Sequence, residues 1–244
     1  MQILIMHGKL YIVATPIGNL SDMSFRAIEV LKSVELIAAE DTRHTRKLLT
    51  HFDIHTKLTS FFKGNENKKF SNLLEILKQG KDVALVSCAG TPCISDPGYP
   101  LLQAAVTEGI TTVPIPGPSA IITALSAAGL STDRFAFIGF LPDKPGKRKK
   151  VLEELKTIDH TLVFYVSVWK VKATLDDLLE VLGDRKICIA RELTKIHEEF
   201  IRGTISEILP LIESKKQKGE FVVLVEGACC RRPVILAKVG IQSE

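Results

Sequence analysis

Two hydrophobic patterns alternate along the first half of the chain. Short apolar runs over 9–14, 35–39 and 82–87 predict strands, and the last run is continuous enough for a strand buried on both faces. Apolar residues spaced three and four apart predict amphipathic helices, for example over 24–32 and 67–79. Because strands and helices alternate, we expect a mostly parallel sheet.

In the second half of the chain, some predicted strands follow one another along the sequence without a helix between them. No helical pattern separates the apolar runs over 186–191 and 197–203, so we expect a mixed sheet there. Pro114, Pro116 and Pro118 punctuate the chain between the two patterns. We therefore predict an α/β fold of two domains, with a mostly parallel sheet in residues 1–117 and a mixed sheet in 118–244. The other predicted strands cover 57–62, 111–115, 134–140, 161–167 and 220–226, and the other predicted helices cover 42–52, 101–108, 119–128, 147–156, 170–182 and 205–214.

Composition excludes several classes of protein. Of the 244 residues, 45% are hydrophobic and 25% are charged, which is typical of a globular protein. No apolar run reaches the ~18 residues of a membrane helix, and residues 1–7 lack the basic start of a signal peptide. We expect a cytoplasmic protein with no membrane partner. The five cysteines are an odd number without zinc-site spacing, which favours reduced thiols and no metal.

Three loops rich in glycine and proline follow predicted strands, at 15–19, 88–98 and 116–119. Ligands of open α/β sheets bind at the carboxyl ends of strands, so the loops indicate a rigid cleft for a small polar molecule. The alternative is that they only make tight turns. The chain lacks both the G-x-G-x-x-G fingerprint and the phosphate-binding G-x-x-x-x-G-K-[ST] loop, which disfavours dinucleotide enzymes and P-loop NTPases.

Two charged runs are candidates for chemistry. Residues 40–47 combine acids, arginines and an imidazole that could position a hydroxyl and accept its proton, or could simply be a helix start. Residues 144–150 hold five basic side chains, which could contact phosphates or form a solvated face. The members of this strip are Lys144, Lys147, Arg148, Lys149 and Lys150.

Six ordered motifs carry a family resemblance. They are Ala-Thr-Pro-Ile-Gly-Asn-Leu at 14–20, Ala-Glu-Asp-Thr-Arg-His-Thr-Arg-Lys-Leu-Leu at 39–49, Ala-Gly-Thr-Pro with Ile-Ser-Asp-Pro-Gly-Tyr within 89–99, Pro-Gly-Pro-Ser-Ala at 116–120, Gly-Phe-Leu-Pro at 139–142 and Arg-Glu-Leu-Thr-Lys-Ile-His-Glu-Glu at 191–199. From about residue 9 to 227 the chain resembles the tetrapyrrole methylase superfamily, and more narrowly its branch that methylates ribosomal RNA.

The resemblance implies two α/β domains with S-adenosylmethionine in the cleft between them. It also implies 2′-O-methylation of a cytidine in the decoding region of 16S rRNA in the small ribosomal subunit, by a homodimer without a metal. Expected cofactor contacts are Gly90, Thr91, Pro92, Ile94, Ser119, Ala120, Phe164, Ser167 and Leu193. Candidates for the acceptor side, including the catalytic base, are Asn19, Glu40, Asp41, Arg43 and His44.

The chain departs from the family pattern at two places beside the expected cleft. Cys88 stands where the family usually has an aspartate, and Val166 where it usually has a glutamate. Val166, Val168 and Trp169 could pack an adenine or form a repacked strand end. Family members also commonly continue into a small helical region beyond the resemblance. Two alternative functions stay open: methylation of a small tetrapyrrole, and ribosome binding without catalysis.

Overall fold

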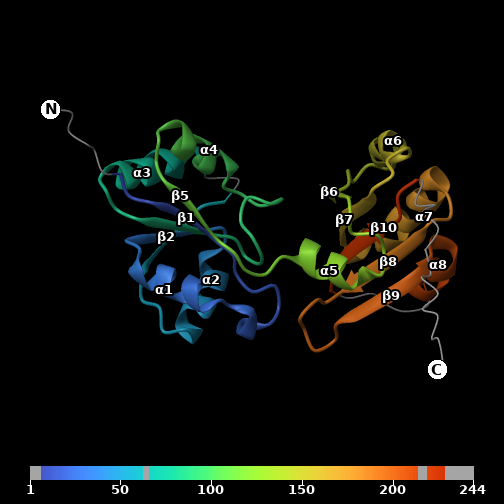
Figure 1. The fold of residues 1–244 in the computed structure, drawn as a ribbon, viewed down its shortest axis with the longest axis horizontal. Helices are drawn as coiled ribbons and strands as arrows, with labels where there is room; N and C mark the ends of the chain where they lie inside the picture. The colour runs from blue at the N-terminus through green and yellow to red at the C-terminus, as the bar shows by residue number, and fades with distance from the viewer. Residues whose placement is uncertain (1–6, 63–65, 214–218, 229–244) are drawn as a thin grey trace, which may run out of the picture.

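Two lobes, each built around a five-stranded sheet, make up the fold (Figure 1). The computed structural model describes residues 7–62, 66–213 and 219–228. The first sheet ends at residue 115 and the second begins at residue 135, on either side of the predicted boundary near Gly117. Among the described residues no helix is long and apolar enough to cross a membrane.

The first sheet has the order β3-β2-β4-β1-β5, and all its neighbouring strands run parallel. This confirms the parallel arrangement that the alternating pattern predicts. The carboxyl ends of the strands therefore share one edge, from which the glycine-rich loops leave. The strands are β1 (Leu10–Val13), β2 (Leu36–Ala39), β3 (Lys57–Ser60), β4 (Val83–Val86) and β5 (Thr112–Ile115).

Helices cover both faces of the first sheet (Figure 1). Leu31 of α1 and Leu49 of α2 pack on one face, while Leu73 of α3 and Leu101 of α4 pack on the other. Each residue of β4 is buried, as the continuous apolar run predicts. The bounds are η1 (Leu20–Asp22), α1 (Phe25–Ser33), α2 (Thr42–His51), α3 (Glu66–Lys78) and α4 (Tyr99–Thr107).

The second sheet has the order β6-β7-β10-β8-β9 and is mixed. Only the β6–β7 pair is parallel; the other three pairs are antiparallel. Three helices, α6, α7 and α8, cover one face, and α5 packs on the other. The bounds are α5 (Ala120–Ala128), β6 (Phe135–Phe140), α6 (Pro145–Leu155), β7 (Thr161–Ser167), η2 (Val168–Lys170), α7 (Val171–Leu182), β8 (Lys186–Arg191), β9 (Glu199–Thr204), α8 (Ile205–Glu213) and β10 (Glu220–Val225).

Two element boundaries differ from the predicted ones beside the cleft. The helix expected from residue 101 begins at Tyr99, directly after Gly98, whose φ of 126° turns the chain. The strand expected from residue 197 begins at Glu199, because the preceding segment forms a turn in which Glu192 and Thr194 have left-handed backbone angles. Hydrophobic spacing carries no signal for either turn.

Candidate functional site

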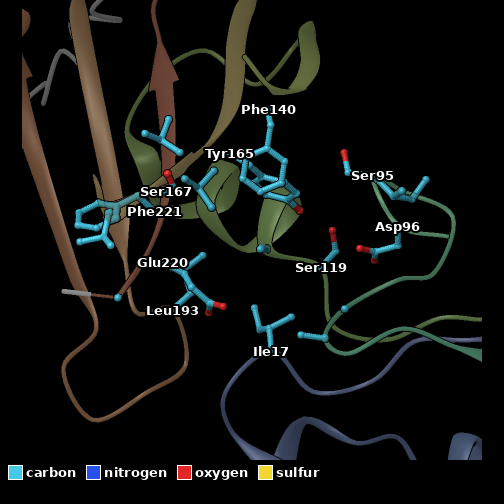
Figure 2. A pocket seen from close by; sticks show the side chains of 18 of the residues that line it. Ile17, Ser95, Asp96, Ser119, Phe140, Tyr165, Ser167, Leu193, Glu220 and Phe221 are labelled. Carbon is cyan, nitrogen blue, oxygen red and sulfur yellow. The ribbon is translucent and has the colours of Figure 1, made fainter. Parts of the chain in front are cut away.

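A cavity of about 370 Å³ opens between the two lobes. Its volume lies within the usual range of small-molecule sites, which is roughly 300–1,000 Å³. Loops after β1, β4 and β5 line it from the first lobe, and β7, β10 and the loop after β8 line it from the second (Figure 2). The lining residues are Ile17, Ala89, Gly90, Thr91, Ile94, Ser95, Asp96, Ser119, Ala120, Phe140, Tyr165, Val166, Ser167, Val168, Trp169, Leu193, Gly219, Glu220, Phe221 and Val222.

Backbone hydrogen bonds fix the first-lobe wall. Thr15 and Gly90 exchange N–H···O bonds of 2.9 Å in both directions, which ties the β1 loop to the β4 loop. The Thr91 hydroxyl donates to the carbonyl of Pro118 at 3.3 Å. Cys93 and Ser95 both have φ near +68°, which is unfavourable for residues with a side chain. Such backbone strain is concentrated at ligand sites.

The second-lobe wall is mainly apolar. Tyr165 and Val166 of β7 lie beside Phe221 and Val222 of β10. Trp169 stands at the rim with 86% of its surface exposed. The Ser167 Oγ is buried and has no hydrogen-bond partner within the described residues. The wall thus offers an apolar slot with one free hydroxyl.

Acidic side chains gather on the first-lobe side. Burial, reinforced by the nearby Glu40 charge, raises the pKa of Asp96 to about 6, although a hydrogen bond from Ser87 opposes the shift. The Cys88 amide donates to Glu40 Oε2 at 3.2 Å. Burial and the Glu40 carboxylate together raise the pKa of the Cys88 thiol to about 12. Figure 2 shows the Asp96 carboxylate pointing toward Ser119 on the same side of the cavity. A carboxylate that changes charge near neutral pH in a cleft is suited to proton transfer.

Seven of the nine expected cofactor residues line the cavity. These are Gly90, Thr91, Ile94, Ser119, Ala120, Ser167 and Leu193. Phe164 does not, because the alternation of β7 turns its side chain into the core beneath the sheet, where it is fully buried. Pro92 is also buried and outside the lining set. The expectation for these two side chains is corrected: Tyr165 and Val166 face the cavity in place of Phe164.

The expected acceptor-side residues divide into two groups. Glu40 lies behind the cavity, against Cys88 and Asp96. The others have local structural partners or face solvent: Asn19 caps η1 through Ser21, and Asp41 caps α2. The amides of His44 and Arg43 donate to Asp41, which holds its pKa below the usual value. Arg43 and His44 are exposed on the first turn of α2.

Two of the five side chains of the basic strip are paired with carboxylates within the protein. Arg148 is only 4% exposed, and its guanidinium donates to Asp177 of α7 at 2.5–2.6 Å. Lys149 bonds both carboxylate oxygens of Glu180 at 2.7 Å. The structure therefore does not present the expected RNA contact Arg148 to solvent, since its charge is buried in an ion pair. Lys144, Lys147 and Lys150 remain exposed.

Sequence reasoning assigned no role to Asp96, Tyr165 or Glu220, all of which line the cavity. Asp96 had a usable signal: it is a carboxylate within a glycine- and proline-rich loop after a strand. Tyr165 also had a signal, because it is two positions before the expected Ser167 in a predicted strand and so shares its face. Glu220 had none, because the pairing of β10 with β7 is not visible in the chain order. No group of three His, Cys, Asp or Glu suited to a metal occurs among the described residues.

The chain matches known proteins over most of its length. Residues 9–209 match the family model of the tetrapyrrole (corrin/porphyrin) methylases. A relative from Halalkalibacterium halodurans named ribosomal RNA small subunit methyltransferase I is 53% identical over 220 residues, covering 90% of this chain and 76% of that protein. The protein of the same name from Escherichia coli O157:H7 is 49% identical over 223 residues, covering 90% and 78%.

Solved structures share the fold at low identity. Diphthine synthase superposes with a TM-score of 0.67 at 14% identity, covering 90% of each chain. Uroporphyrin-III-C-methyltransferase from Thermus thermophilus superposes with a TM-score of 0.62 at 21% identity, covering 91% of this chain and 94% of that one. Both confirm the two-domain α/β architecture. On the sequence matches and this fold together, the chain belongs to the tetrapyrrole methylase family, in the group of relatives named ribosomal RNA small subunit methyltransferase I.

Proposed function

We propose that the chain uses S-adenosylmethionine to methylate ribosomal RNA, at the 2′-oxygen of a cytidine in the decoding region of 16S rRNA. The observation that carries the proposal is the cavity between the lobes, which is lined by residues of the motifs that carry the family resemblance. The cytoplasm, the small ribosomal subunit and a homodimeric state belong to the same proposal, on the strength of the family resemblance.

The cavity residues fit S-adenosylmethionine. Val166, Phe221 and Val222 form an apolar wall suited to a flat heterocycle, and the unpaired Ser167 Oγ offers that heterocycle a hydrogen bond. Asp96 and Glu220 bring carboxylates suited to positive charge. The cofactor would supply an electrophilic methyl group on a sulfonium.

The residues of the first lobe would prepare the acceptor. A ribose hydroxyl is a weak nucleophile until a neighbouring group accepts its proton. We assign that role to the Glu40–Asp96 pair, with Asp96 as the acceptor because it lines the cavity while Glu40 lies behind it. The rigid loops at 15–19 and 116–120 would then hold the hydroxyl in line, which is the larger part of the task.

Exposed cations would hold the RNA backbone. Lys144, Lys147 and Lys150 face solvent on the first turns of α6, close in sequence to the cavity residue Phe140. Each would contribute mainly charge, because surface lysines contact phosphates without reading sequence.

The first experiment is calorimetric titration of the purified chain with S-adenosylmethionine. The variant Thr91→Trp fills the cavity and should abolish binding, whereas Thr107→Trp at the exposed end of α4 should bind like wild type. Equal binding by wild type and Thr91→Trp would place the cofactor elsewhere.

The second experiment incubates the chain and cofactor with 30S particles that lack the modification. Nuclease digestion and mass spectrometry should reveal one new 2′-O-methylcytidine. Binding of the cofactor without transfer to 30S particles or free 16S rRNA would contradict the proposed function. Turnover of uroporphyrinogen instead would assign the chain to small-molecule methylation.

A further inference from the structure

The cations on helix α2 differ from those on α6 in having few partners. Arg46 and Lys47 are exposed and make no ion pair within the described residues, and Arg43 touches only its own capping residue Asp41, at 4.0 Å. On α6, by contrast, Arg148 and Lys149 are held by carboxylates of α7. Helix α2 therefore offers an outside anion adjacent cations without a carboxylate partner in the described part of the chain, in addition to the exposed Lys144, Lys147 and Lys150 at the start of α6.

The free cations of α2 share one face. Positions 43, 46, 47 and 50 are neighbours on a helix surface, and Thr45, Leu48 and Leu49 point the other way into the core. A shallow groove follows this face, lined by Thr42, Arg43, Arg46, Lys47 and Thr50. No carboxylate lines it. The groove thus combines three cations and two hydroxyls, spread over about 12 Å of helix axis at 1.5 Å per residue.

Helix α2 also begins beside the candidate reaction centre. It follows β2 directly, and β2 lies next to β4 in the parallel sheet. Glu40, which connects β2 to α2, receives the Cys88 amide from the β4 loop and lies against Asp96. A chain that delivers a ribose to Asp96 would therefore have its neighbouring phosphates near α2.

We propose that the α2 groove, formed by Thr42, Arg43, Arg46, Lys47 and Thr50, binds the phosphate backbone of the RNA next to the methylated nucleotide. The proposal rests on the proposed function for the identity of the polyanion. The arginines suit phosphate oxygens through paired N–H donors, and the Thr42 hydroxyl adds a neutral donor, whereas the Thr50 hydroxyl donates to the Arg46 carbonyl at 2.9 Å. Lys144, Lys147 and Lys150 would then contact RNA farther along the strand.

The test measures binding of 16S rRNA at several KCl concentrations. The principal variant is Arg46→Gln with Lys47→Gln, which leaves the acceptor-side candidate Arg43 in place. Losing two phosphate contacts should reduce the slope of log K against log[KCl] by roughly 1.4–1.8, since each contact contributes about 0.7–0.9. Affinity at low salt should fall at least tenfold.

A matched control removes the same charge from the opposite edge of the sheet. Lys32 and Lys81 are exposed and precede β2 and β4, so Lys32→Gln with Lys81→Gln should keep the wild-type slope. S-adenosylmethionine titration should give equal affinities for both variants and wild type, which shows that the cavity is intact. A wild-type slope in the α2 variant, or an equal loss in the control, would overturn the proposal.

The readouts separate this proposal from the function it rests on. If wild type methylates 30S particles and the α2 variant keeps wild-type binding, the α2 groove fails and the function stands. If wild type binds 16S rRNA through α2 without methylating it, the function fails and the groove stands.

Discussion

Asp96 shows at the scale of one residue how burial prepares a carboxyl group for chemistry. Its raised pKa has two causes, loss of water and the Glu40 charge, and both come from the fold. Glu40 is 56 positions earlier in the chain, so the interaction exists only because β2 and β4 are neighbours. The sequence could place Asp96 in a ligand loop but could not predict its altered acidity.

The raised pKa predicts a pH dependence for methyl transfer. The protonated carboxyl cannot accept a proton, so the rate of wild type should fall as pH drops through about 6. Asp96→Asn should lower the rate by roughly 10²–10⁴ and lose this acidic limb. Single-turnover rates between pH 5 and 9 test this, with the exposed Asp133→Asn as a control that keeps the wild-type profile.

The raised pKa of Asp96 also predicts that its ionised form lowers the stability of the folded protein. A folded-state pKa above the ordinary 3.8 means that the folded protein binds the proton more tightly than the unfolded chain. Stability from this group is therefore full below pH 3.8 and is lost as pH rises to about 6. Asp96→Asn should melt at a higher temperature than wild type at pH 8 and at an equal one near pH 4. A lower melting temperature at pH 8 would contradict the assigned cause.

At the scale of elements, the hydrophobic pattern predicted most of what the structure shows. Strands such as β4 and β8 fall within a residue of their expected bounds, because apolar runs report burial directly. The sequence did not predict which charged residues form ion pairs within the protein. Arg148 and Lys149 looked like a basic strip, and their partners Asp177 and Glu180 lie on α7, about 30 residues away.

The buried pair predicts how α6 is held to α7. Arg148→Met keeps the side-chain length but leaves the Asp177 charge buried alone, which should reduce the free energy of unfolding by about 3–5 kcal/mol. Lys149→Met breaks a largely exposed interaction and should cost less than about 1 kcal/mol. Urea unfolding measures both. The double variant Arg148→Met with Asp177→Leu should regain most of the lost free energy of unfolding, because no charge is then left buried alone. If the double variant stays as unstable as Arg148→Met, the ion pair itself contributes to stability.

At the scale of the whole molecule, the two lobes come close to each other at Gly18 and Gly139. A Cβ added at Gly18 would lie 2.6–2.9 Å from Lys195 Cγ, Thr194 Oγ1 and the Leu193 carbonyl oxygen. A Cβ at Gly139 would lie 3.0 Å from the Ser95 Oγ. Both glycines stand within the motifs that carry the family resemblance, but the opposed segments come from different lobes. The sequence therefore predicted which segments line the cavity, but it could not predict how closely the two lobes approach each other.

This contact predicts that the separation of the lobes controls cofactor affinity. Gly18→Val would force the 193–195 loop away and widen the cavity, so the dissociation constant for S-adenosylmethionine should rise roughly tenfold, equivalent to about 1.4 kcal/mol. Gly146→Ala has open space around its Cβ and should bind like wild type. Circular dichroism should show both variants folded. An unchanged affinity of Gly18→Val for S-adenosylmethionine would mean that the lobes accommodate the larger side chain without a loss of binding free energy.

The protonated thiol of Cys88 has a chemical consequence for a site of methyl transfer. A thiolate is a far better nucleophile than a hydroxyl, so an ionised cysteine one residue from the cavity could capture the methyl group itself and inactivate the protein. With a pKa of about 12, only about one Cys88 in 10⁵ is ionised at pH 7. The Glu40 carboxylate, to which we assign a part in preparing the acceptor, therefore also helps to keep a competing nucleophile protonated, which would protect the protein from methylation of its own Cys88.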